Sequence, residues 1–593
     1  MEPQVLILQQ ERIDDVPLLL GQMQRLNLAE TLDKHLGQHP LHQGLSNGNL
    51  IVGWIAYILS QADHRKFAVQ TWANGLQHTL QSFFNQTVRP HEFSDDRLGI
   101  TLNHLADADW DSLEGDVFQA CFDVYQFPTD TFRVDATATC GYHHIEPDGI
   151  MQLGHSKDHR PDLPQLKIMA AVTQPLAFPI STAIVPGNQS DDCLYWGTIV
   201  EVKKKITASG LLFVGDCKMA SEDTLARIVD AKDNYLTPLP NIGQTAKLLG
   251  FWVNKALELA TANLLKTQFK PSPDANTPAE AIGRGYEFTR DRNTQIEGRD
   301  VHWVERVLIV QSFAHRDSQN ANLDKKLHRA ESELSQLTLS GKGRRVWRQE
   351  QELEEAIKAI EKRYGVEGLL SVEVGVERSE KKTYGSPGRP ATSAVGEVSV
   401  EERHRIASVS RNEEAIAARK ERQGWRALVT NTSEERLDLE GCVLTYREGG
   451  GLERPFQQLK GEPLGIRPLF VRLEKQIVGL TRLLLLALRV LMMVEIVLRA
   501  KLSEEGAKLN NIYEGQSNRE DGKPTGTRVL GAICRLGLSV SLLQFGEQQW
   551  WSMPALPDLL VRVLELLGLS PSLYTNLATT GSCSPSVGPE PDG

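Results

Sequence analysis

The sequence predicts an α/β protein in which a mixed-sheet core follows a helical domain and is interrupted by a large inserted module. Short β-branched, apolar runs bounded by Gly, Pro or Asn begin near residue 131 and indicate strands. Helical segments lie between and after these runs, in the order expected of a mixed sheet. The chain has 593 residues, whereas one hydrophobic core rarely serves more than roughly 250–300, so several modules are expected.

Residues 1–120 are predicted to form a helical domain. Apolar residues recur at helical spacing within residues 16–26 and again within residues 50–58. Asp95 and Asp96 follow a serine and precede another apolar stretch, which is typical of a helix N-terminus. We therefore interpret these adjacent carboxylates as capping groups rather than catalytic ones.

Residues 128–240 are predicted to form the first part of the core. Asp135 lies within an apolar strand, where an ionised carboxylate is costly unless it faces a ligand or a partner. Asp216 ends another strand, at the edge where open α/β sheets usually place ligand groups. For each aspartate alone, a turn or capping role is an equally good interpretation. The predicted strands are FRVDATAT (132–139), LKIMAAVT (166–173), FPISTAIV (178–185) and LLFVGD (211–216).

The rest of the chain is predicted to contain three further parts. Residues 241–424 form the inserted module, which combines β-rich segments with a helical hairpin. Residues 425–503 return to the core, and residues 504–593 form a C-terminal tail with helical parts. Leu323, Leu327, Leu334 and Leu337 are predicted to share one face of the first helix of the hairpin, and Leu353, Ile357 and Ile360 to point inward from its second.

Composition and charge restrict the classes of function. The net charge of -11 argues against a nucleic-acid partner, although residues 441–500 carry nine Lys/Arg against five Asp/Glu. The seven cysteines show no CxxC spacing, which favours reduced thiols inside a cell. The N-terminus lacks a basic start followed by an apolar run, so no signal peptide is expected. The apolar stretch 477–498 contains three charged residues at helical spacing, which favours a core helix over a membrane span.

A third candidate element follows in TYREGGGLERPFQQLKGEPLGIRP (445–468). Glu453, Phe456 and Lys460 share one helical face in this segment. A glutamate facing a metal ion and a lysine facing a DNA phosphate would form one edge of an active site, and a solvated Glu–Lys face is the alternative. Two divalent ions about 3.5–4 Å apart, held by carboxylates, serve the attacking and leaving oxygens of phosphodiester cleavage.

These residues support a resemblance to a known family. Tyr446, Glu453 and Lys460 resemble the Tyr…Arg…Glu…Lys signature of insertion-sequence DDE transposases. The continuation RPLFVRLEKQIVGLTRLLLLAL (467–488) resembles the subgroup related to insertion sequence 1634, and RVDATATCGYH (133–143) and FVGDCKMAS (213–221) are similar to its first-Asp and second-Asp strands. The opening ERIDDVPLLLGQM is similar to the helical domain that heads these proteins, so the resemblance covers most of the chain.

The resemblance implies an RNase H-like core in which Asp135, Asp216 and Glu453 hold two Mg²⁺ ions, with Mn²⁺ as a possible substitute. It further implies that Tyr446, Lys460 and Arg454 contact DNA phosphates. The expected activity is cut-and-paste transposition, in which a homodimer in the bacterial cytoplasm acts on double-stranded terminal inverted repeats and target DNA. The N-terminal helices are then candidates for recognising DNA ends, and the C-terminal part for pairing subunits.

Two features bear on this expectation. Where the signature has Arg, this chain has Gly449, and the run Gly449–Gly451 should weaken the local helix by roughly 1 kcal/mol per glycine. Trp303 and Trp347 are candidates for gripping a flipped base, with core packing as the alternative. The rival interpretations are a metal-dependent nuclease on the same fold and an inactive, transposase-derived DNA-binding protein.

Overall fold

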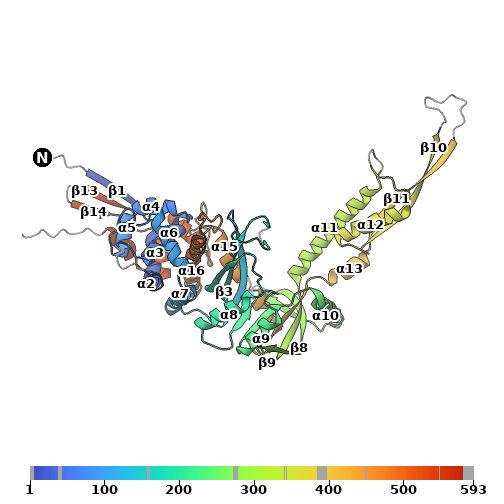
Figure 1. Ribbon diagram of the computed structural model, residues 1–593, viewed down its shortest axis with the longest axis horizontal. Coiled ribbons are helices and arrows are strands. Elements are labelled where there is room, and N and C mark those ends of the chain that lie inside the picture. The colour runs from blue at the N-terminus through green and yellow to red at the C-terminus, as the bar shows by residue number, and fades with distance from the viewer. Residues whose placement is uncertain are drawn as a thin grey trace, which may run out of the picture. The chain divides into compact units, whose positions relative to one another are not determined.

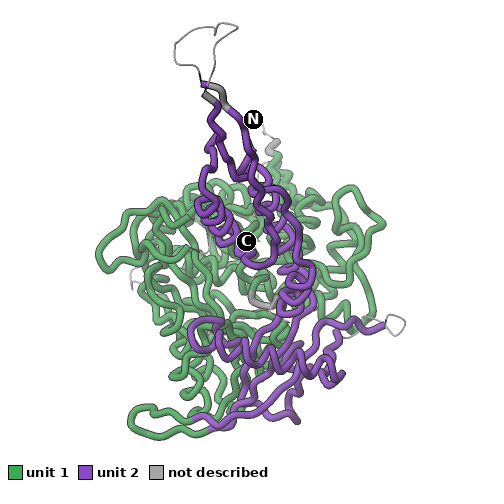
Figure 2. The backbone as a smooth tube through the Cα atoms, turned by 90° about the vertical axis from the view of Figure 1, so that its right-hand side faces the viewer, with its two compact units in different colours: residues 1–237, 293–302, 445–593 green, residues 238–292, 303–444 purple. Residues whose placement is uncertain are grey.

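The computed structural model describes residues 6–37, 43–156, 160–270, 278–339, 341, 344–383, 397–447, 450–545 and 548–578. The chain divides into two compact units (Figure 2). Unit 1 comprises Met1–Thr237, Asn293–His302 and Thr445–Gly593, and unit 2 comprises Pro238–Arg292 and Trp303–Leu444.

Helices dominate the N-terminal part of unit 1. The Ser46 hydroxyl accepts a hydrogen bond from the Asn49 amide at 3.1 Å and caps the third helix, and Asp109 caps the seventh in the same way. The apolar residues that recur at helical spacing are buried between these helices. The helices are α1 (Val16–Arg25), α2 (Leu28–His35), α3 (Asn47–Gln61), α4 (Lys66–Asn74), α5 (Gln77–Phe84), α6 (Asp95–Asp107) and α7 (Trp110–Tyr125).

The C-terminal segment completes this helical part rather than forming a separate tail. Strand β1 (Leu6–Arg12) pairs antiparallel with β13 (Ser539–Phe545), which pairs with β14 (Gln548–Ser552). The buried Tyr574 hydroxyl donates to the Asp14 carbonyl at 2.8 Å. The expectation of a distinct region 504–593 is therefore wrong for these residues, because they lie in the same folded layer as the N-terminus. The remaining C-terminal helices are α17 (Gly526–Cys534), α18 (Asp558–Leu567) and α19 (Ser572–Thr575).

A mixed sheet lies in unit 1 beside the helical part, as the predicted α/β fold class requires (Figure 1). Its strands run in the order β4-β3-β2-β5-β6. Strands β4, β3 and β2 are antiparallel neighbours, whereas β5 is parallel to β2 and β6 is parallel to β5. The elements are β2 (Thr131–Cys140), β3 (Gln165–Thr173), β4 (Pro179–Pro186), α8 (Leu194–Lys205), β5 (Leu212–Val214), α9 (Glu222–Asp230) and β6 (Asn234–Pro238).

The long helix α16 (Glu474–Glu505) forms the core of unit 1. It is long and apolar enough to span a membrane by length and composition, and 89% of its most apolar window is buried inside the fold. A Cβ atom at Gly479 would lie 2.1 Å from the Leu102 carbonyl oxygen, so glycine allows α16 and α6 to pack closely. Among its charged residues, Arg489 is buried and paired with Glu114 of α7. The core-helix interpretation of this segment agrees with this burial.

Unit 2 contains four sheet strands and a helical module. The strands run in the order β12-β9-β8-β7, and β12 pairs with β9 from Trp425↔Gln311 to Thr430↔Arg306. Strand β12 begins at Trp425, the first residue predicted for the second part of the core, and its antiparallel partner β9 lies in the range predicted for the inserted module. These strands are β7 (Lys266–Lys270), β8 (Glu280–Ile296), β9 (Arg299–Ser312) and β12 (Trp425–Thr430), and α10 (Gly243–Thr261) precedes them.

The helical hairpin of unit 2 has a hydrophobic core of its own. Helices α11 and α12 pack against each other and against β11. Leu337 is partly buried and packs against this core, and the other residues predicted on the facing sides of the hairpin are buried in it, which agrees with the helical spacing. The elements are α11 (Phe313–Leu337), α12 (Glu350–Tyr364), the antiparallel ribbon of β10 (Leu370–Thr383) with β11 (Glu397–Arg411), and α13 (Glu413–Glu421).

Candidate functional site

Strand β2 carries polar side chains on one face for the first half of its length. Arg133 and Asp135 are half-buried, whereas the alternate residues Phe132 and Val134 are buried. The parallel register of β2 and β5 ends at Arg133↔Val214. Asp135 lies two residues beyond this last pair on β2, and Asp216 lies two residues beyond it, past the end of β5.

Asp216 is held by hydrogen bonds to its side chain and to its backbone. The Tyr195 hydroxyl donates to Asp216 Oδ1 at 2.6 Å, and the Lys218 amide donates to the same oxygen at 2.9 Å. The Thr237 hydroxyl donates to the Asp216 carbonyl at 2.6 Å. Burial raises the pKa of Tyr195, and the negative charges of Asp216 and Asp135 raise it further. Of the two aspartates, Asp216 is the one that the Tyr195 hydroxyl contacts directly.

Arg133 connects Asp135 with the segment that carries Glu453. Its guanidinium donates to the Tyr446 carbonyl at 2.7 Å and lies 5.4 Å from the centre of the Tyr446 ring. Burial lowers the pKa of Arg133, and the negative charges of Asp135 and Glu453 oppose that shift. Glu453 is exposed on α15 (Gly450–Lys460), which packs against β2. Asp135 on β2 and Glu453 on α15 thus lie on two elements that pack against each other, and Asp216 follows the strand that pairs with β2.

The carboxylates of Asp135, Asp216 and Glu453 are the type of ligand that a hard divalent cation prefers, but the described structure does not group them into a metal site. Carboxylate oxygens are the ligands that Mg²⁺ prefers. Within the described ranges of the chain, no three His, Cys, Asp or Glu side chains are grouped so that they could hold a metal ion. Metal binding by Asp135, Asp216 and Glu453 therefore stays a prediction.

Arg454 is an anchor of α15 instead of a surface cation. Its guanidinium pairs with Glu495 of α16, which is fully buried and also pairs with Arg499 at 2.8 Å. Gln458 donates to the same carboxylate at 2.9 Å. Burial lowers the pKa of Arg454 to about 10, and the charge of Arg499 adds to this shift. The prediction that Arg454 contacts a DNA phosphate is therefore corrected. Its partner in the structure is a buried carboxylate some forty residues later in the chain.

This difference between Arg454 and Lys460 gives a testable prediction. Arg454→Ala should lower the free energy of unfolding by about 1–3 kcal/mol, since Glu495 would lose one of its two cations. Lys460→Ala should reduce the salt dependence of DNA binding by about one counterion. Thermal unfolding and DNA binding across a salt series measure the two effects. A reduced salt slope in Arg454→Ala with unchanged stability would contradict the assignment.

The other predicted features have mixed outcomes. Gly449 lies outside the described residues, and Gly450 and Gly451 stand in the first turn of α15, which forms despite them. Trp303 is 8% exposed and Trp347 is 5% exposed, so both pack in cores as the alternative interpretation held. Phosphate contacts by Tyr446 and Lys460 stay predictions.

Sequence reasoning missed Tyr195 and Arg133. A tyrosine near the start of an amphipathic helix looks like an ordinary core residue, and only the fold brings its hydroxyl to Asp216. Arg133 had a signal, because it stands two residues before Asp135 and therefore on the same face of the strand.

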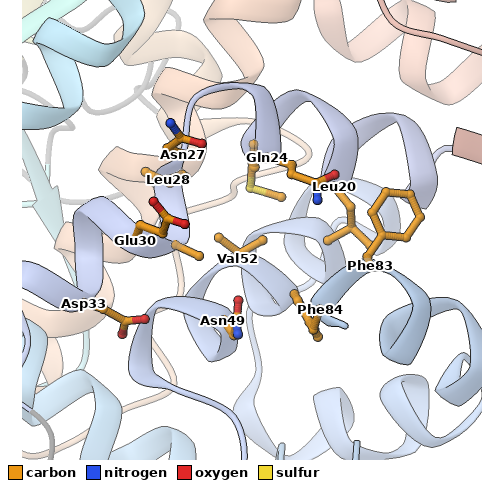
Figure 3. Close-up of a pocket in the computed structure, with 12 residues that line it drawn as sticks. Leu20, Gln24, Asn27, Leu28, Glu30, Asp33, Asn49, Val52, Phe83 and Phe84 are labelled. Carbon is orange, nitrogen blue, oxygen red and sulfur yellow. The ribbon is translucent and has the colours of Figure 1, made fainter. Parts of the chain in front are cut away.

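A hollow of about 260 Å³ lies in the N-terminal helices, between α1, α2, α3 and α5 (Figure 3). Its apolar wall includes Met23, Val52 and Phe83, and its polar residues include Glu30 and Asp33. No lysine or arginine is among the described residues that line it. Two carboxylates without a cation repel phosphate, so this hollow is not a site for the DNA backbone.

Comparisons with known proteins find one family match and a distant structural likeness. Residues 8–118 match a family described as "Domain of unknown function (DUF4277)", a segment that ends before Asp135. A search of curated proteins finds no match. Among solved structures, the chain is similar to that of a piggyBac transposase synaptic complex with hairpin DNA, with a TM-score of 0.33 and 9% sequence identity. The likeness covers 95% of this chain and 83% of that one.

Proposed function

We propose that this chain is a DDE-class DNA transposase that cuts and rejoins DNA at the ends of an insertion sequence. The observation that carries the proposal is the position of three carboxylates around one pair of strands: Asp135 lies within β2, Asp216 lies two residues beyond the end of its parallel neighbour β5, and Glu453 lies on a helix packed against β2. The strand order β4-β3-β2-β5-β6, with three antiparallel strands followed by two parallel ones, supports an RNase H-like core.

The residues of the site have complementary roles in this proposal. Asp135 and Asp216 would hold divalent cations, with Glu453 as the third carboxylate, and Lys460 would neutralise a phosphate oxygen. When bound, Mg²⁺ or Mn²⁺ lowers the pKa of the attacking water and stabilises the leaving oxygen. Arg133 fixes the Tyr446 segment that precedes α15. Double-stranded DNA would be the partner, and a homodimer in the bacterial cytoplasm would bring two DNA ends together.

The test is cleavage and joining of a DNA duplex that carries the inverted repeats flanking the gene. The full chain is incubated with Mg²⁺ or Mn²⁺, and Asp135→Ala, Asp216→Ala and Glu453→Ala are compared with wild type. Each substitution should reduce both steps by at least about 10³-fold while DNA binding persists, because each removes a ligand of the catalytic ions. Cleavage without any joined product would favour a nuclease, and equal cleavage by one variant would remove that carboxylate from the site.

A second candidate is an inactive, transposase-derived DNA-binding protein. The specific observation in its favour is that, among the described residues, Glu453 does not join the two aspartates in a group able to hold metal. This candidate predicts DNA binding that depends on neither Mg²⁺ nor Asp135. Binding without cleavage by the wild-type chain would select it over the transposase.

A further inference from the structure

Tyr195 is a buried group whose hydroxyl points at a candidate metal ligand. It is the second residue of α8, is 1% exposed, and donates to Asp216 Oδ1 at 2.6 Å. Helix α8 packs against β2, β3 and β4, so the ring is fixed by the sheet that carries Asp135. A hydrogen bond this short to a carboxylate is of the strong, charge-assisted kind.

The two hydrogen bonds to the Asp216 side chain determine which carboxylate oxygen is left to bind a ligand. Both the Tyr195 hydroxyl and the Lys218 amide donate to Oδ1, in the part of the chain that the structure describes. A carboxylate held through one oxygen cannot rotate about its bond without losing both partners. Oδ2 is therefore the oxygen presented to a ligand.

The loop that supplies the second donor is itself anchored. The Lys218 ammonium pairs with Asp191 at 3.1 Å, and Asp191 pairs with Lys167 at 2.7 Å. Burial would raise the pKa of Asp191, but the hydrogen bonds from Lys167 and Lys218 outweigh it and lower the pKa. The Asp191 carboxylate is thus ionised and holds both lysines. This pairing keeps the Lys218 amide in place behind Asp216.

We propose that Tyr195 is a positioning residue, whose hydroxyl holds Asp216 Oδ1 so that Oδ2 faces a divalent cation. This inference rests on the proposed function, since it assigns to Tyr195 the support of a ligand of that same site. Partners that orient metal ligands typically contribute 10–100-fold to metal affinity. Tyr195→Phe keeps the ring and its packing and removes the hydroxyl, so it isolates this contribution.

The experiment is a Mn²⁺ titration of the full chain, followed by the electron paramagnetic resonance signal of free Mn²⁺. Asp216→Asn serves as the variant without the ligand. Tyr125→Phe serves as the matched control, because its hydroxyl bonds to Gln22 at 2.7 Å, away from both aspartates. Tyr195→Phe should bind Mn²⁺ about 10–100-fold more weakly, and Tyr125→Phe should bind it as wild type does.

A second readout separates positioning from a general structural role. Raising the Mn²⁺ concentration should restore DNA cleavage by Tyr195→Phe but not by Asp216→Asn, and the thermal midpoints of the two tyrosine variants should be similar. Wild-type Mn²⁺ affinity in Tyr195→Phe would overturn the positioning role while leaving the proposed function intact. Absence of any Asp216-dependent Mn²⁺ binding in the wild type would overturn both.

Discussion

Replacing Glu114 by alanine should lower the free energy of unfolding of unit 1 by about 3–5 kcal/mol. The Glu114 side chain is fully buried on α7 and pairs with Arg489 of α16 and, at 3.3 Å, with Lys205 of α8. It also accepts a hydrogen bond from the Thr182 amide of β4 at 3.0 Å. Its removal leaves a guanidinium that is 1% exposed without its carboxylate, in a place where water cannot replace it.

Thermal and denaturant unfolding of the full chain measure this loss. Asp116→Ala is the matched control, because Asp116 lies on the same helix but is exposed and pairs with His35 at 3.0 Å at the surface. That control should change stability by less than about 1 kcal/mol. A triple variant, Glu114→Leu with Arg489→Met and Lys205→Met, should recover much of the loss, because neither cation that pairs with Glu114 is then left buried. Equal decreases in the free energy of unfolding for Glu114→Ala and Asp116→Ala would show that the buried ion pairs of Glu114 do not stabilise the fold more than an exposed pair does.

Much of the core sheet could be predicted because its strands are apolar, β-branched and bounded by turn residues. The predicted strands 132–139, 166–173 and 178–185 agree with β2, β3 and β4 to within one residue at each end. Strand β6 was missed because it has five residues, ends in proline and shows no alternation of its own. Residues 234–238 form a strand because they pair with β5, and the sequence of the segment alone does not show this pairing.

The candidate site divides in the same way. Asp135 and Asp216 could be selected because an acidic residue within or at the end of an apolar strand is visible in the sequence. Tyr195 could not, since its role depends on where α8 sits on the sheet. Arg454 was assigned to phosphate from the family resemblance, whereas its buried partner Glu495 lies on another helix. Spacing along a helix gives the face, and only the tertiary packing gives the partner.

The N-terminal strand shows the same limit over the longest distance. The seven residues of β1 pair with β13, more than five hundred positions later. The Arg25 guanidinium donates to the Leu567 carbonyl at 2.7 Å, and the His78 ring stacks on Trp551 at 3.6 Å. The sequence of the N-terminal helices does not indicate that they pack against residues from the C-terminal part of the chain.

Ending the chain after Gly537 should therefore prevent the N-terminal helices from reaching their native stability. The truncation removes the strand partner of β1, the bond from Tyr574 to Asp14, and the buried residues Leu560, Val563 and Leu564 of α18. Each buried apolar side chain of this size contributes about 1.5–3 kcal/mol, so the expected loss is comparable with the whole stability of a domain. Hydrogen exchange of α1 in the full and truncated chains measures it, with a chain ending at Ala578 as the control.

The truncation also decides how the segment that matches the family of residues 8–118 folds. Loss of exchange protection in α1 in the truncated chain, with protection kept in the control, is the result expected if both ends of the chain form one cooperative unit. Adding residues 538–578 back as a separate peptide should then restore part of the protection, because the contacts are non-covalent. Full protection of α1 in the truncated chain would instead mean that the N-terminal helices fold alone and that β13, β14 and α18 only rest on them.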